Sequence, residues 1–191
     1  MITALLLLSY IGLQAGFVWA RYAVFRIDGP TPPGVRVIEV STLLSIALGI
    51  ALIAGRHAGL AVADAAALAL AGASAAMFGW ALRSVRRRQL SAAFSRDLPA
   101  ELLRTGAFGF VRNPFYRAYL LAHAVPLLAA RSAWGLLPLA GMALVYRRAV
   151  QLEERKFVAS PLGAEWQRYA LSTGRFLPHL PSRHKSRESP T

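Results

Sequence analysis

The first twenty residues, Met1 to Ala20, contain no charged side chain. The hydrocarbon core of a bilayer is about 30 Å thick, and about 20 consecutive apolar residues in a helix can cross it. The segment lacks the basic start and the small-residue cleavage site of a signal peptide, so we expect a permanent transmembrane helix. This constraint favours a membrane protein over a soluble fold.

Four more apolar stretches follow the first. The whole chain is 55% apolar and only 16% charged, which is oilier than an ordinary soluble domain. The last two stretches are separated only around Arg131, which predicts a tight helical hairpin. We therefore expect an all-α polytopic membrane protein with about five transmembrane helices, a C-terminal helical hairpin and a cytoplasmic capping segment. The predicted spans are Met1–Ala20, Val37–Gly55, Ala58–Leu82, Pro114–Ala130 and Ser132 to about Val150.

The distribution of basic residues explains the net charge of +13 better than nucleic-acid binding does. If the first helix runs from outside to inside, only Arg56 and Arg131 fall on the outer side. This is the positive-inside pattern, with the N-terminus outside and the C-terminus cytoplasmic. The inner groups are Arg21, Arg26 and Arg36; the seven arginines from Arg83 to Arg112; Arg117; and the nine Lys or Arg from Arg147 onward.

The chain reads as one domain, residues 1–178, followed by a basic tail at 179–191 that we expect to be disordered. Asp28–Gly34 predicts a turn-rich loop. The small residues of Ala61–Ala76 favour close helix packing. Beyond Val150 the last span is expected to continue into water through Phe157, and Ala164–Leu171 predicts a short amphipathic helix at the interface.

The absence of cysteine excludes disulfides, thiolate chemistry and cysteine metal sites. The four histidines have no ligand spacing, so we expect no metal site, and His123 is expected to be a packed, hydrogen-bonded residue. Asp64 is expected at the outer interface. The chain also lacks the sequence signatures of a Rossmann nucleotide site, a P-loop or a hydrolase nucleophile elbow.

The run Arg112-Asn113-Pro114 has two interpretations. Asn is a favoured N-cap and Pro a favoured first helical residue, so the run can simply start the helix at Pro114. The same helix N-terminus also offers free amide donors and a partial positive charge to a ligand carboxylate, and Arg112 would reinforce that preference.

Glu153 and Glu154 point about 100° apart on a helix. Glu153 has Lys156 three residues later, which predicts a solvated ion pair, although a functional role stays open. Glu154 has no cationic neighbour at helical spacing. A carboxylate at the membrane edge without a local partner needs one from elsewhere, which favours a functional role for Glu154.

With these residues, the chain resembles the isoprenylcysteine carboxyl methyltransferase family of integral membrane enzymes, and the wider group that includes phospholipid N-methyltransferases. The resemblance covers about residues 100–178. The order and spacing of its pieces carry it, because each piece alone is weak. The pieces are Gly106-Ala107-Phe108, Arg112-Asn113-Pro114-Phe115-Tyr116, Glu153-Glu154, the segment from Leu162 to Tyr169, and Arg175-Phe176-Leu177-Pro178.

This resemblance implies that S-adenosylmethionine binds on the cytoplasmic side, over the helical hairpin, and that an oily substrate enters sideways from the bilayer. It also implies catalytic roles for Arg112 and Arg148, with Arg148 or Arg147 holding an acidic acceptor. Three positions depart from the family pattern: Asn113 replaces a histidine, Phe108 a tyrosine and Val150 an arginine. The implied cofactor contacts are Ala100, Glu101, Leu102, Leu103, Phe108, Asn113, Pro114, Phe115, Tyr116, Glu153 and Glu154.

The expected reaction is direct displacement at the sulfonium methyl, in which positioning supplies much of the rate gain. Phe108, Tyr116 and Trp166 offer aromatic faces for the sulfonium cation. A carboxylate acceptor is already ionised and needs no base, which favours carboxyl O-methylation of a lipophilic molecule. Phospholipid N-methylation, phenolic-lipid O-methylation, a non-catalytic scaffold that keeps the fold, and a small transporter remain alternatives.

Overall fold

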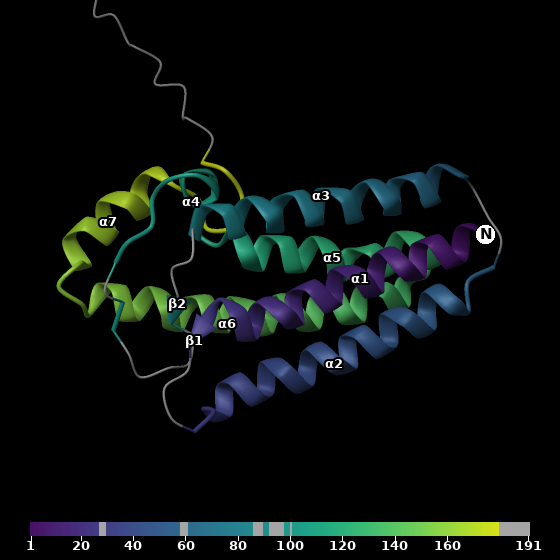
Figure 1. Cartoon of the computed structure of the whole chain (residues 1–191), viewed down its shortest axis with the longest axis horizontal. Helices are drawn as coiled ribbons and strands as arrows, with labels where there is room; N and C mark the ends of the chain where they lie inside the picture. The colour runs from purple at the N-terminus through teal and green to yellow at the C-terminus, as the bar shows by residue number, and fades with distance from the viewer. Residues whose placement is uncertain (27–29, 58–60, 86–89, 92–97, 100, 180–191) are drawn as a thin grey trace, which may run out of the picture.

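The computed structural model is all-α, apart from one two-residue strand pair, and describes residues 1–26, 30–57, 61–85, 90–91, 98–99 and 101–179. Five long helices lie side by side along the long axis of the molecule (Figure 1). They are α1 (Ile2–Ala23), α2 (Pro33–Ala54), α3 (Ala61–Val85), α5 (Pro114–Ala130) and α6 (Leu136–Val158). The described residues also form two shorter helices, α4 (Ala107–Phe110) and α7 (Gly163–Ser172), and the 3-10 turn η1 (Ala133–Gly135).

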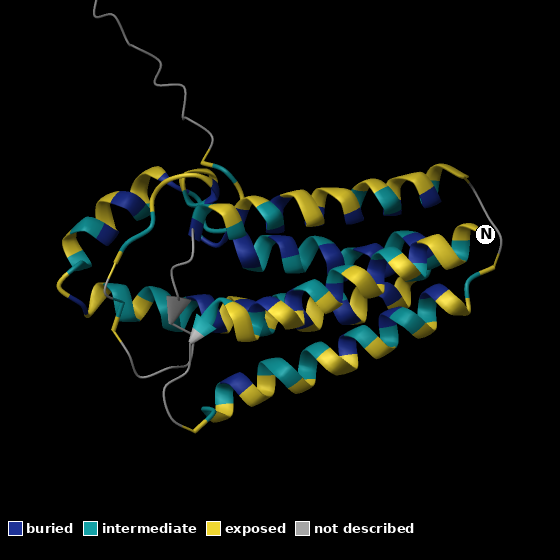
Figure 2. Ribbon diagram, viewed as in Figure 1, coloured by how far each residue is buried: buried dark blue, intermediate teal, exposed yellow. Residues whose placement is uncertain are grey.

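Helices α1, α2 and α3 are each long and apolar enough to cross a membrane. Large exposed apolar side chains on these helices include Leu8, Trp19 and Leu44. Figure 2 shows exposed positions recurring along α1, α2 and α3. A soluble domain would bury most of these groups, whereas lipid tails accept them at no cost. The prediction of a membrane protein is supported at this level.

Small residues let α3 lie directly against α5, as the alanine-rich sequence predicts. Ala67, Ala71 and Ser74 are buried, and the Ser74 hydroxyl donates to the Ala118 carbonyl of α5 at 2.7 Å. Nearer the end that holds α4, an aromatic cluster fills the space between α1, α3 and α5, with Phe17 4.8 Å from Phe78 between ring centroids.

Helix α5 occupies the residues that the sequence predicts for it, and α6 returns alongside it as the second arm of the expected hairpin. Arg131 turns the chain in the left-handed conformation, with φ 51°. His123 of α5 is completely buried and, as expected, hydrogen-bonded: its Nδ1 lies 2.9 Å from the Ser45 hydroxyl of α2. Interhelical polar contacts of this kind hold helices together in lipid.

Several local predictions need correction. The predicted loop Asp28–Gly34 is shorter than expected, because α2 begins at Pro33, a favoured first helical residue. The loop before α5 contains helix α4. No strand was expected, yet Phe25–Arg26 (β1) pairs in parallel with Leu90–Ser91 (β2), a long-range contact that local sequence does not reveal.

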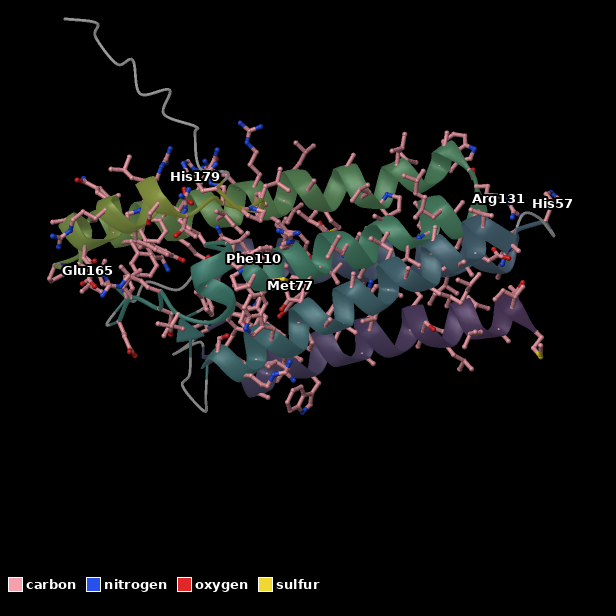
Figure 3. The ribbon with its side chains drawn as sticks, turned by 90° about the horizontal axis from the view of Figure 1, so that it is seen from above. His57, Met77, Phe110, Arg131, Glu165 and His179 are labelled. Atoms are coloured by element: carbon pink, nitrogen blue, oxygen red, sulfur yellow. The ribbon has the colours of Figure 1, made fainter. Side chains whose placement is uncertain are left out.

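The end of the molecule opposite α7 carries a buried ion pair. Asp64 in the first turn of α3 pairs with Arg56, and both side chains are less than one-tenth exposed. The position of Asp64 at the outer interface stays a prediction, and the structure adds that Arg56 neutralises its carboxylate inside the fold. Arg131 donates to the His57 carbonyl beside it (Figure 3).

Candidate functional site

The start of α5 and the end of α6 lie at the same end of the bundle, together with α4 and α7 (Figure 1). The chain reaches α5 through a sharp turn at Gly106, whose φ of 62° is a conformation that residues with a Cβ rarely adopt. The Ser84 hydroxyl of α3 accepts the Ala107 amide at 2.9 Å and fixes this turn to the bundle. The motif residues from Arg112 onward are placed by this connection.

Arg112 is the residue that joins three segments at this end. Its Nη1 donates to the carbonyls of Ala170 at 2.7 Å and Thr173 at 2.5 Å, at the end of α7. Its Nη2 lies 3.3 Å from Oε1 of Glu154 on α6. Among the described residues, its Nε is buried with no hydrogen-bond partner. Arg112 is thus held rigidly while one donor stays unused.

Glu154 finds its partners far along the chain, as its lack of a local cation predicts. Arg175 donates to it with two nitrogens, Nε to Oε1 at 3.0 Å and Nη2 to Oε2 at 2.5 Å. The Glu154 side chain is 15% exposed and that of Arg175 is 39% exposed. Paired arginine–carboxylate bonds of this kind are both strong and directional. Glu154 is therefore fixed between Arg112 and Arg175.

Asn113 occupies the N-cap position of α5 but does not cap the helix with its side chain. Its Nδ2 instead donates to the Arg175 carbonyl at 3.3 Å, and its backbone amide donates to the same carbonyl at 3.2 Å. The simple capping interpretation is therefore wrong for the side chain. Asn113 and Glu154 meet through Arg175, one at its backbone and the other at its guanidinium.

Glu153 accepts a hydrogen bond from the Tyr116 hydroxyl of α5 at 2.9 Å. It is half-buried, and burial raises the pKa of its carboxyl to about 7, a rise that the neighbouring charge of Glu154 supports and that Tyr116 and Lys156 oppose. The expectation of a solvated ion pair with Lys156 is wrong in one respect. The charge of Lys156 does act on Glu153, but the Glu153 carboxylate is half-buried against α5 and not solvated. The sequence alone does not reveal the Tyr116–Glu153 contact, because the two residues are 37 positions apart.

The aromatic residues of the motif serve mainly to pack the site. Phe115 is buried in the aromatic core, 5.3 Å from Phe25 between ring centroids. Trp166 stacks on Phe157 at 4.7 Å and has the Arg112 guanidinium 5.7 Å from its ring. Phe115 and Trp166 therefore have structural partners and are buried. Phe108 and Tyr116 also have ring neighbours but are only half-buried, so their faces remain the better candidates to meet a sulfonium.

The segment before α4 contributes less to this cluster. Ala100 lies outside the described residues. Glu101 is exposed, whereas Leu102 and Leu103 are half-buried and Leu103 packs on the aromatic core. Pro114 is buried as the first residue of α5. Leu103 and Pro114 therefore contribute packing beside the site.

The two arginines proposed to hold an acidic acceptor are exposed on α6. At 3.6 residues per turn, Arg148 is rotated by about 120° from Glu154, whereas Arg147 is rotated by only about 20°. Arg148 therefore does not share a face with Glu154, and Arg147 is the better placed of the two, about 10 Å farther along the helix axis.

Sequence reasoning missed the roles of Arg175 and Arg117. Arg175 supplies both the guanidinium that binds Glu154 and the carbonyl that binds Asn113. Arg117 donates to the Phe176 carbonyl at 3.1 Å and lies over the Phe110 ring. The available signal was the Gly-Arg-Phe-Leu-Pro segment at the end of the resemblance, whose arginine offered the distant cation that Glu154 needed.

The arrangement offers a fixed carboxylate, a half-buried carboxyl, one unused guanidinium donor and aromatic faces at one end of the bundle. Within the part of the chain that the structure describes, no group of three His, Asp or Glu side chains is arranged to hold a metal. No protein-family model matches this chain, and no curated protein matches it. The functional conclusion therefore depends on the site itself and on the motif order.

Proposed function

We propose that this protein is a membrane-embedded methyltransferase that uses S-adenosylmethionine to methylate a lipophilic acceptor. The observation that carries the proposal is the meeting of Arg112, Asn113, Glu154 and Arg175 at one end of the bundle. These residues belong to separate pieces of the family pattern. A chance match of weak motifs gives no reason for their side chains and backbone to form one hydrogen-bonded cluster.

The proposal includes five membrane spans, with α5 and α6 added to the three apolar helices. Helix α5 has 17 residues, or about 25 Å at 1.5 Å per residue, which suits a slightly thinned bilayer. Helix α6 has 23 residues and extends beyond the membrane at its charged end. The end that holds α4 and α7 would face the cytoplasm, because most basic residues lie there.

The residues present fit the polar groups of S-adenosylmethionine. The buried, unused Nε of Arg112 and the half-exposed Arg175 suit the carboxylate of the amino-acid end. Glu154 suits an ammonium or ribose hydroxyl, and Phe108 and Tyr116 offer aromatic faces to a cation. When bound, the cofactor supplies an electrophilic methyl group. The chain then holds the acceptor in line, excludes water and balances charge.

Titration with labelled S-adenosylmethionine in detergent tests this function. We expect saturable binding to the purified wild type and at least about tenfold weaker binding to Glu154→Ala, because one charged hydrogen bond contributes about 1.5–3 kcal/mol. Glu165→Gln is the matched control, since Glu165 lies at the same end and pairs with the exposed Arg104 (Figure 3). Absence of binding, or equal binding by all three proteins, would contradict the proposal.

The fully engaged Glu154 favours one other candidate, a non-catalytic membrane scaffold that keeps the fold. Arg112 and Arg175 together satisfy both carboxylate oxygens, as in a purely structural ion-pair network. Asn113 in place of the family histidine points the same way. A scaffold predicts no methyl transfer by the wild type and no gain in Asn113→His, whereas an enzyme predicts turnover by the wild type.

A further inference from the structure

Tyr116 and Glu153 form a second unit beside the Arg112–Glu154–Arg175 cluster. Glu153 is adjacent to Glu154 in sequence, but it points to a different partner, the Tyr116 hydroxyl at 2.9 Å. The Tyr116 ring packs against two other rings, with centroid distances of 6.1 Å to Tyr119 and 5.2 Å to Tyr146. The pair therefore has a fixed position at the mouth of the α5–α6 hairpin.

The charged and titratable groups that face Glu153 come from two helices. Tyr116 and Tyr119 face it from α5, and Lys156 and Glu154 act on it from α6. No guanidinium is recorded against it among the described residues, in contrast to the two on Glu154. Burial raises the pKa of the Glu153 carboxyl to about 7, and a base works best when its pKa lies near the working pH.

We propose that Glu153 is the general base that removes a proton from the methyl acceptor, with Tyr116 as the residue that positions it. This inference rests on the proposed methyltransferase function. It assigns the acceptor to the lipophilic molecules with a weakly acidic hydroxyl, such as a phenol. The sequence offered no base and therefore favoured a carboxylate acceptor. The Tyr116–Glu153 contact supplies that missing group.

The step balances without any further reagent. The acceptor oxygen forms a bond to the donor's methyl carbon while the carbon–sulfur bond breaks and its electron pair stays on the neutral sulfur. The proton of the acceptor hydroxyl goes to the Glu153 carboxylate. After the product leaves, Glu153 releases that proton to water. Tyr116 keeps its own proton and holds the carboxylate in place.

The base separates a hydroxyl from the other acceptor classes. A neutral amine already carries a free lone pair and attacks without a base. A hydroxyl is a weak nucleophile until its proton is removed, so a carboxylate beside it contributes most to this reaction. A carboxylate acceptor is already ionised and would leave the base without a proton to remove.

The first measurement needs no cofactor. Infrared difference spectra of the wild type minus Glu153→Gln, recorded across pH, report the protonation of the Glu153 carboxyl directly. For the wild type we expect the midpoint at about pH 7, the pKa of the Glu153 carboxyl. We expect a higher midpoint in Tyr116→Phe, because a hydrogen bond that favours the carboxylate is lost. A carboxyl that titrates in the ordinary range of an exposed glutamate would overturn the proposal.

The second measurement is single-turnover methyl transfer to three probes that share one alkyl chain and end in a phenol, an amine or a carboxylate. We expect transfer to the phenol, with a rate that rises with pH through the Glu153 midpoint and falls by about 10²–10⁴-fold in Glu153→Gln. Titration of the same variant with labelled S-adenosylmethionine separates a loss in the transfer step from a loss in cofactor binding. Glu39→Gln, at an ion pair with Arg21 elsewhere in the bundle, is the control.

The outcomes separate this inference from the function on which it rests. Failure of the wild type to bind S-adenosylmethionine would reject the methyltransferase, while the infrared titration would still report on Glu153. Normal binding with transfer to the carboxylate or amine probe alone, or to none of the three, would overturn the general base. So would an undiminished rate of phenol methylation in Glu153→Gln.

Discussion

At the residue scale, Glu153 makes the stability of the protein depend on pH. The pKa of its carboxyl is raised from 4.5 to about 7, so the folded state holds the proton more tightly than the unfolded chain. Its contribution is therefore fully present below pH 4.5 and is lost as the pH rises through 7. A rise of this size corresponds to about 3 kcal/mol at high pH.

We expect Glu153→Gln to raise the unfolding temperature in detergent at pH 8 and to leave it nearly unchanged at pH 4. The amide stays uncharged, and its oxygen can still accept from Tyr116. Thermal unfolding of both proteins across this range measures the effect, and Glu165→Gln shows how much any exposed acid contributes. A lower melting temperature for Glu153→Gln at pH 8 would mean that the ionised carboxylate stabilises the fold.

A second prediction at this scale concerns Arg175, which binds Glu154 through two nitrogens. Arg175→Ala leaves the half-buried Glu154 with Arg112 alone, and we expect a loss of about 1–3 kcal/mol in the free energy of unfolding. Arg168→Ala removes an exposed arginine of α7 and should have little effect. A double-mutant cycle with Glu154→Ala measures the coupling between the two residues, and a coupling near zero would contradict it.

At the element scale, the close approach of α3 to α5 limits the size of the side chains between them. Ala67 is completely buried, whereas Ala66 is exposed on the neighbouring face of α3. We expect Ala67→Leu to destabilise the protein by about 1–3 kcal/mol through overpacking, and Ala66→Leu to be neutral because it faces lipid. Unfolding of both variants in detergent is the measurement, and equal stabilities would contradict this packing.

Helices were the elements that the sequence predicted best. The bounds of α5 agree because Pro114 marks its start and Arg131 interrupts the apolar run after Ala130. The α5–α6 hairpin follows from the same interruption. The β1–β2 pair was missed because its strands are two residues long and 65 residues apart, so neither carries a period that local reasoning can read.

At the scale of the whole molecule, charge distinguishes the two ends of the bundle. At the end opposite α7, the ion pair with Asp64 neutralises Arg56, so this arginine adds no net positive charge beside His57 and Arg131. Among the described residues, the end with α4 and α7 has several exposed arginines, including Arg104, Arg147 and Arg148. On the positive-inside pattern, we propose that the candidate site faces the cytoplasm.

Single cysteines test this orientation, because the chain has none of its own. His57 and His179 are both exposed and lie near opposite ends of the bundle (Figure 3). We expect an impermeant maleimide to label His57→Cys on intact cells and to label His179→Cys only after the membrane is opened. The reverse pattern would invert the topology and put the candidate site outside.

The sequence predicted which residues belong to the candidate site better than it predicted the contacts between them. Arg112, Asn113 and Glu154 were named from the motif order, and the structure joins them. The bond from Tyr116 to Glu153 was not predicted, because it depends on how α5 and α6 rotate against each other. Arg148 was predicted to belong to the site, but its position on α6 turns it away from Glu154.

The carbonyls of Gly174 and Arg175 accept the amides of Arg112 and Asn113, which lie ahead of α5 in the chain. This segment follows all five long helices in the chain, so it is synthesised after them. Until residue 175 has been made, the protein has neither the carbonyls that bind Arg112 and Asn113 nor the guanidinium that binds Glu154. The candidate centre is therefore completed only after both arms of the α5–α6 hairpin have been synthesised.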